Sequence, residues 1–195
     1  MEKIIHRVNK KSDLVNLDKN YGVEIDLRSW GKDLIINHDP FLKGEYFEEW
    51  IKFYDHKTLI LNVKEEGLED KILEILKSLS IDNFFFLDQS FPFIKKYAFL
   101  GEKRCAIRVS EFESLETVLN MKDMVEWVWV DCFTKFPINF SEFKKLKDYK
   151  FKLCIVSPEL QGRFKKEEII NFKKKLINQN IVGDAVCTKY PNLWE

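Results

Sequence analysis

Short apolar runs alternate with segments of helical spacing along the whole chain, and the alternation repeats eight times. The apolar runs predict strands over residues 4–8, 21–27, 58–63, 83–87, 104–109, 125–130, 151–156 and 184–188. Between them, apolar residues recur three or four positions apart, as in Leu68, Ile72 and Leu76, which is typical of a helix with one buried face. The dominant unit is therefore a strand followed by a helix.

One interruption follows the second predicted strand. The segment Trp30-Gly31-Lys32-Asp33 has turn composition and leads into Leu34-Ile35-Ile36, an extra strand that folds back before a helix around Tyr46 to Tyr54. Eight strand–helix units predict an α/β protein, a (β/α)8 TIM barrel with short loops and an extra β-hairpin after strand 2. No linker composition divides the chain, so residues 1–195 are expected to form a single domain.

Composition narrows the classes of partner. The chain is 45% hydrophobic, which predicts a packed core. It carries 32 basic and 32 acidic side chains, so no overall positive potential is expected to attract nucleic acid. No apolar run is long enough for a transmembrane segment, and we expect a cytoplasmic protein. The four cysteines lack the paired spacing of zinc or redox motifs and are expected to be buried, reduced thiols: Cys105, Cys132, Cys154 and Cys187.

The second strand carries an unusual pair of acidic residues. Its period of two places Glu24, Asp26 and Arg28 on one face. Two carboxylates inside a barrel repel each other and are costly to bury unpaired, so they require a cation. That cation is either a divalent metal ion or the guanidinium of Arg28.

Two histidines are predicted to approach this carboxylate pair. His6 ends the first strand, and His38 follows the extra strand, where antiparallel pairing places it opposite Ile25. Histidine gains or loses a proton near neutral pH, which suits acid–base catalysis. His56 lies before the third strand, and we assign it no role.

These motifs resemble one known family over nearly the whole chain. The matching segments are His6-Arg7, Glu24-Ile25-Asp26, His38-Asp39-Pro40, Asn62-Val63-Lys64, Thr188 and Pro191. Together they resemble the glycerophosphodiester phosphodiesterase branch of the phospholipase C-like barrels. The resemblance implies that His6 and His38 are catalytic and that Glu24 and Asp26 bind a divalent cation, Mg²⁺ or Ca²⁺. The chain departs from the family at Asn62, where a glutamate is usual, and at Val8, where glycine is usual.

The change at position 62 bears on the metal site. An amide oxygen still binds Mg²⁺ or Ca²⁺, so Asn62 remains a candidate ligand. A compensating carboxylate is expected, and Asp88, directly after the fourth strand, is the candidate. A turn or helix N-cap role for Asp88 is the alternative.

Other polar residues near strand ends are candidates for holding the substrate. Arg7, Lys64 and Arg28 are expected to bind phosphate oxygens. Arg108 ends the fifth strand and Asp131 follows the sixth, and Glu159 lies in the polar segment after the seventh strand; all three are candidate substrate contacts.

The function predicted from these residues is a metal-dependent phosphodiesterase that cleaves a glycerophosphodiester or a related diester by two-histidine acid–base catalysis. The attacking group is water or a neighbouring substrate hydroxyl. The alternative is a noncatalytic phosphate- or glycan-binding barrel; short bacterial barrels with Leu-Asn-x-Lys and Ser-Pro-Glu-Leu segments, similar to surface-polysaccharide-associated proteins, resemble this chain. A barrel lyase or aldolase is disfavoured because only Lys64 suits a Schiff base. The expected partners are a small phosphodiester or phosphodiester-linked glycan, with homo-oligomerisation as a further possibility.

Overall fold

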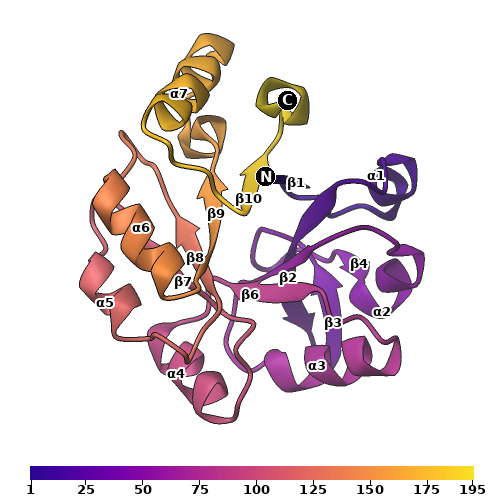
Figure 1. The fold of residues 1–195 in the computed structure, drawn as a ribbon. Helices are drawn as coiled ribbons and strands as arrows, with labels where there is room; N and C mark the ends of the chain where they lie inside the picture. Colours follow the sequence, from indigo (N-terminus) through magenta and orange to yellow (C-terminus); the bar gives the residue numbers. More distant parts are fainter.

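In the computed structural model, which describes residues 1–195, ten strands form one curled sheet within a mixed α/β fold (Figure 1). Its parallel strands are β1 (Glu2–Ile5), β2 (Gly22–Trp30), β5 (Leu59–Val63), β6 (Phe84–Leu87), β7 (Ala106–Val109), β8 (Trp127–Val130), β9 (Lys152–Val156) and β10 (Ala185–Thr188). Strand β1 pairs with both β10 and β2, so the first and last parallel strands are neighbours. All eight strands predicted from the apolar runs are present.

The seam between β6 and β7 is the weakest in the sheet. These two strands meet at a single bridge between Phe86 and Cys105, where the backbone N–H of Phe86 donates to the carbonyl of Arg104 at 2.8 Å. By contrast, β5 and β6 pair from Leu59–Phe84 to Asn62–Leu87. The predicted TIM barrel is therefore confirmed in part, as a curled sheet with one thinly paired seam.

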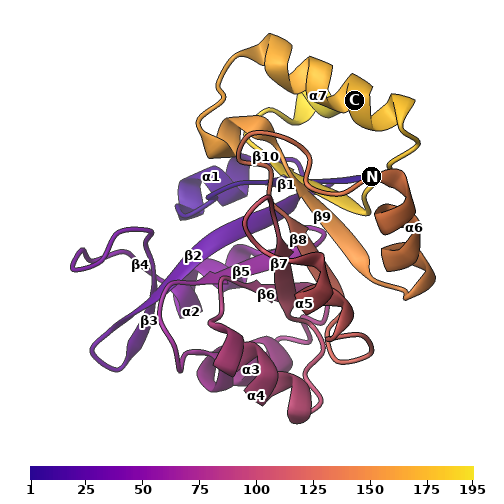
Figure 2. The ribbon, with the colours of Figure 1, turned by 90° about the vertical axis from the view of Figure 1, so that its left-hand side faces the viewer.

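Helices cover the outer face of this sheet (Figures 1 and 2). The α-helices are α1 (Lys11–Asn16), α2 (Phe47–Trp50), α3 (Glu69–Ser78), α4 (Phe91–Phe99), α5 (Leu115–Leu119), α6 (Phe140–Asp148) and α7 (Lys166–Asn178). Single 3₁₀ turns are η1 (Ile51–Phe53), η2 (Pro158–Gln161) and η3 (Pro191–Trp194). The eighth unit thus continues into a 3₁₀ turn where the strand–helix pattern predicts an α-helix. None of the helices has the length and apolar character needed to cross a membrane.

The predicted hairpin after the second strand is confirmed. Strand β2 extends beyond its parallel neighbours and pairs antiparallel with β3 (Asp33–Ile36), which in turn pairs with β4 (Glu45–Tyr46) (Figure 2). Gly31 takes a left-handed φ of 63° in the two-residue loop, where a side chain would be strained. The backbone N–H of Asn37 donates to the carbonyl of Asp26 at 3.0 Å, which continues the register and brings His38 opposite Ile25.

Two apolar clusters lie on opposite faces of the curled sheet. The larger packs strand residues such as Ile25 and Leu61 against helix residues such as Ile72 and Leu146. The smaller contains no α-helical residue and fills the inside of the curl: Ile4, Ile60, Phe85, Leu87, Ala106, Trp127, Trp129, Cys154, Val156, Ala185 and Cys187. All four cysteines are buried and unpaired, as predicted. Because Glu24 and Asp26 share the inward parity of Gly22, they lie inside the curl, toward the C-terminal ends of the strands.

Candidate active site

A cavity of about 320 Å³ at the C-terminal ends of the parallel strands collects most of the predicted site residues. Those that line it are His6, Arg7, Glu24, His38, Asn62, Lys64, Asp88, Arg108 and Asp131. They come from the ends of β1, β5, β6, β7 and β8, from the first half of β2 and from the loop after β3, which are distant in sequence. The fold therefore brings the predicted histidines, carboxylates and basic side chains to one place.

The loop after β1 turns sharply over β2. Arg7 has a φ of 58°, a left-handed conformation that costs strain in a residue other than glycine. The turn is fixed on both sides, because the backbone N–H of His6 donates to the carbonyl of Thr188 at 3.1 Å and that of Val8 donates to the carbonyl of Glu24 at 2.8 Å. This backbone places both the His6 ring and the Arg7 guanidinium at the cavity.

Glu24 is completely buried, and protein donors satisfy both of its carboxylate oxygens. Oε2 accepts a hydrogen bond of 2.7 Å from the backbone N–H of Arg7, and Oε1 accepts one of 2.9 Å from Nδ2 of Asn62. Burial, together with the neighbouring Asp26 carboxylate, raises the pKa of Glu24 to about 7. A positive charge close to the Glu24 carboxylate would therefore be favourable.

Asp26 is also buried and is held by three side chains. Asn9 clamps it, because Nδ2 donates to Oδ2 at 2.8 Å while Oδ1 of Asn9 accepts from the backbone N–H of Asp26 at 3.0 Å. Nζ of Lys64 lies 3.2 Å from Oδ1, and Nε of Arg7 lies 3.5 Å from Oδ2. The basic groups beside the carboxylate pair are therefore Lys64 and Arg7.

The two histidines differ in their surroundings. Nε2 of His6 lies 3.9 Å from Oε2 of Glu24, and its Nδ1 is buried without a hydrogen-bond partner. Burial, assisted by the positive charges of Arg7 and Lys189, lowers the pKa of His6 to about 3, so this imidazole is neutral at pH 7. His38 is more exposed, and its Nδ1 lies 2.8 Å from Oδ1 of Asp39. A carboxylate only accepts, so this contact leaves Nε2 of a neutral His38 free to take a proton.

The oxygen atoms around Glu24 fit a hard divalent cation. Oδ1 of Asn62 is buried and accepts no hydrogen bond, Oδ1 of Asp26 has only its ion pair with Lys64, and the two residues pair directly across β2 and β5. Carboxylate and amide oxygens are the ligands that Mg²⁺ and Ca²⁺ prefer. No group of three or more His, Cys, Asp or Glu side chains is arranged to hold a metal ion. The third side-chain oxygen beside the two carboxylates is Oδ1 of Asn62.

Asp88, the predicted compensating ligand, lies across the cavity in an ion-pair network. It takes a left-handed φ of 61°, accepts a hydrogen bond from the guanidinium of Arg108 and lies 3.3 Å from Nζ of Lys64. Arg108 also approaches Asp131, with 3.7 Å between Nη1 and Oδ2, and Nε2 of Gln161 donates to Oδ1 of Asp131 at 2.6 Å. Burial raises the pKa of Asp131. The network orders basic groups opposite the carboxylate pair.

Two predicted substrate contacts do not line the cavity. The guanidinium of Arg28 donates to the carbonyl of His38 at 3.0 and 3.1 Å and so braces the loop that carries His38. Glu159 is buried, where Oε1 accepts hydrogen bonds from Oγ1 of Thr188 at 2.6 Å and from the backbone N–H of Lys189 at 2.8 Å. Both side chains support neighbouring backbone in this structure.

Several residues of the site were not predicted from the sequence. Asn9 holds Asp26, and its only sequence signal is its place just beyond the first strand. Trp129 also lines the cavity, and the alternation of side chains along β8 could have predicted that it faces inward. The other missed lining residues are Leu87 and Val156, and Phe133, Leu160 and Gln161 complete the lining.

Comparison with known proteins shows the fold. No protein-family model and no curated protein matches the sequence. Among solved structures, the chain is similar to a glycerophosphodiester phosphodiesterase from Agrobacterium tumefaciens, with a TM-score of 0.68, 8% identity and coverage of 100% of this chain and 98% of that one. It is also similar to a glycerophosphoryl diester phosphodiesterase from Parabacteroides distasonis, with a TM-score of 0.67, 13% identity and coverage of 98% and 84%. The match to this fold, which the sequence motifs predicted, extends over the full chain.

Proposed function

We propose that this protein is a metal-dependent phosphodiesterase that cleaves a glycerophosphodiester or a related phosphodiester. The observation that carries the proposal is that His6, His38 and Glu24 line one cavity, with Asp26 buried two residues after Glu24 on β2. The curled sheet is taken as a (β/α)8 barrel in which chemistry belongs at the C-terminal strand ends, and this cavity lies there.

In this proposal the basic side chains bind the phosphate and the histidines transfer protons. Arg7 and Lys64 bind the phosphate oxygens and stabilise the charge that develops on them, with Arg108 on the opposite side. One histidine takes the proton from the attacking hydroxyl, and the other delivers a proton to the leaving alkoxide. Asp39 fixes the ring of His38 during these transfers.

Glu24, Asp26 and Asn62 would hold Mg²⁺ or Ca²⁺. When bound, the ion supplies Lewis-acid polarisation of the phosphoryl group and offsets the negative charge of the carboxylate pair. Asp88 then acts as an orienting partner of Arg108 and Lys64, since its carboxylate is directed to those two cations.

A noncatalytic phosphate- or glycan-binding barrel is the second candidate. It is favoured by one observation: Lys64 and Arg7 already compensate Asp26 without a metal ion. Under this alternative the same basic groups bind phosphate, and the histidines serve recognition only.

Turnover of a panel of phosphodiesters distinguishes the two candidates. The panel contains glycerophosphodiesters with small, sugar and lipid alcohols, each incubated with Mg²⁺, Ca²⁺ or a chelator. Phosphorus NMR reports a monoester or a cyclic phosphate. Metal-dependent product formation that is lost with the chelator supports the phosphodiesterase. Binding of the same compounds without any product supports the binding barrel.

A further inference from the structure

We propose that the cleft between β6 and β7 binds the alcohol part of the phosphodiester, and that this alcohol is a cyclic polyol such as a sugar. The proposal rests on the phosphodiesterase function proposed above and assigns its substrate class. It concerns a cavity beyond the one that holds the histidines.

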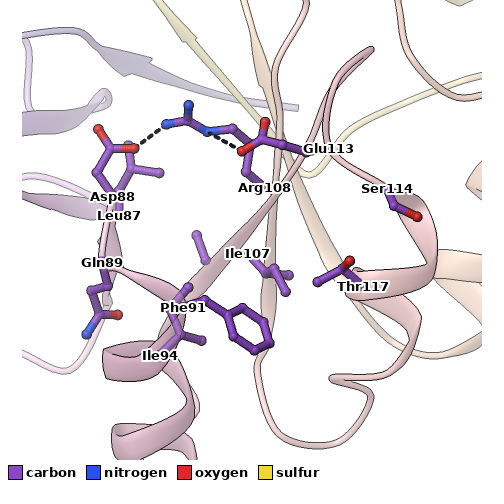
Figure 3. A pocket seen from close by; sticks show the side chains of 11 residues that line it. Leu87, Asp88, Gln89, Phe91, Ile94, Ile107, Arg108, Glu113, Ser114 and Thr117 are labelled. Atoms are coloured by element: carbon purple, nitrogen blue, oxygen red, sulfur yellow. Dashed lines mark hydrogen bonds and ion pairs between the residues drawn. The ribbon is translucent and has the colours of Figure 1, made fainter.

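This cleft exists because the seam between β6 and β7 is thinly paired. After the Phe86–Cys105 bridge the two strands form no further backbone pair, and a cavity of about 590 Å³ lies between them, α4 and α5 (Figure 3). Pockets for small ligands have volumes of roughly 300–1,000 Å³. Glycerol alone would leave most of this volume to water, whereas a sugar ring or two would occupy it.

The cleft is continuous with the candidate active site. Leu87, Asp88 and Arg108 line both cavities. The ion pair of Asp88 and Arg108 spans the top of the cleft, and Nε of Arg108 lies 4.0 Å from Oε1 of Glu113 on the other side (Figure 3). A phosphate bound among Arg7, Lys64 and Arg108 therefore has its ester oxygen at the entrance of the cleft.

The lining combines an apolar surface with hydrogen-bonding groups. The ring of Phe91 projects into the cleft beside Ile94 and is 47% exposed, as a stacking surface must be (Figure 3). Gln89 also lines the cleft but is only 8% exposed, and its Nε2 donates to Glu69 at 2.9 Å. Thr117 contributes a hydroxyl from α5. Thr117 and Glu113 are both exposed, so a ligand in the cleft can reach their oxygen atoms.

This pattern favours a polyol over an acyl chain. An alkyl group would cover the Asp88–Arg108–Glu113 charges and the Thr117 hydroxyl without replacing their hydrogen bonds to water. A sugar ring places C–H groups against Phe91 and offers hydroxyls to Thr117 and Glu113. The occupant that leaves fewest polar groups unsatisfied is therefore a hydroxylated ring.

Calorimetric binding of glucose 1-phosphate, glycerol 3-phosphate and octyl phosphate tests the assignment without any need for turnover. The variants are Phe91→Ala and Thr117→Val, and Phe99→Ala is the matched control, because Phe99 is an exposed phenylalanine on the same helix that does not line the cleft. We expect glucose 1-phosphate to bind about tenfold tighter than glycerol 3-phosphate. Both cleft variants should lose that preference and leave glycerol 3-phosphate affinity unchanged, while Phe99→Ala alters neither.

Three results would overturn the polyol assignment: no binding of glucose 1-phosphate, equal loss of both ligands in the cleft variants, or tighter binding of octyl phosphate. The outcome is separate from that for catalysis. Cleft-dependent sugar phosphate binding with no diester turnover would remove the phosphodiesterase and retain the subsite. Turnover of glucosyl and glyceryl diesters that is equally insensitive to Phe91→Ala and Thr117→Val would retain the enzyme and remove the subsite.

Discussion

The side-chain amide of Asn62 donates a 2.9 Å hydrogen bond to Oε1 of Glu24 from the neighbouring strand. In the family that the sequence motifs resemble, a glutamate usually stands at this position. The amide of Asn62 donates to Glu24 where a third carboxylate would repel it. Its Oδ1 remains buried and without a donor, which leaves one oxygen for a metal ion.

Replacing Asn62 by glutamate should make the fold dependent on a divalent cation. In the presence of a chelator, Asn62→Glu adds a buried carboxylate beside Glu24 and Asp26 and should lower the free energy of unfolding by about 3 kcal/mol. Saturating Mg²⁺ or Ca²⁺ should recover much of this loss. Thermal unfolding measures both effects, with Asn120→Glu as the control at an exposed helix end. Equal destabilisation with and without metal would argue against a cation site at residue 62.

Removing one carboxylate should abolish metal-linked stabilisation. For the unmodified protein, a divalent ion at 100 times its Kd should add about 2.7 kcal/mol to the free energy of unfolding. In Glu24→Gln this increment should largely disappear, because the charged ligand is lost while the side chain keeps its shape. Calorimetry with Mg²⁺ and Ca²⁺ gives the comparison. An unchanged response in the variant would place the ion elsewhere.

Glu111 is expected to make a pH-dependent contribution to the free energy of unfolding. Its carboxylate anchors the loop that places Phe133 at the cavity. Although burial opposes ionisation, backbone N–H groups of Lys135 at 2.7 Å and Thr134 at 2.6 Å lower the pKa of Glu111 to about 2. Its folded pKa lies below its ordinary value of 4.5, so its stabilisation is complete above pH 4.5 and is lost as the pH falls toward 2.

The substitution Glu111→Gln tests this pH dependence. It should lower the free energy of unfolding by about 2 kcal/mol at pH 7 and by little at pH 2. Denaturant unfolding across this range checks it, with Glu116→Gln as the exposed control on α5. A difference between Glu111→Gln and the unmodified protein that stays constant from pH 7 to pH 2 would contradict the assignment.

Period and spacing were sufficient to predict the strands, the hairpin and its register. The approach of His38 to the carboxylate pair follows from antiparallel pairing around Gly31, because the short turn leaves only one alignment. The local sequence pattern is therefore enough to predict the position of His38. The motifs also led to the same fold that the similar solved structures show.

Tertiary contacts decided what the sequence could not predict. Arg7 and Asp88 adopt a left-handed backbone conformation that neighbouring strands impose. Neither residue is a glycine, so the sequence gives no signal of this conformation. Arg28 shares the parity of Asp26, but β2 extends past the rim, so its guanidinium reaches the His38 carbonyl instead of the cavity. The opening of the β6–β7 seam depends on packing between distant segments, and no spacing in the sequence encodes it.

The most direct test of the proposed phosphodiesterase is the cleavage rate of a glycerophosphodiester with saturating Mg²⁺ or Ca²⁺, compared among the unmodified protein, His6→Ala, His38→Ala and His56→Ala. His56 is the matched control because it does not line the cavity and contacts the carbonyl of Leu17. We expect a loss of about 10²-fold or more in each of the first two variants and a change within about twofold in the third, with thermal unfolding showing all three folded. Equal cleavage rates in all four proteins, or no cleavage by the unmodified protein, would contradict two-histidine catalysis at this site.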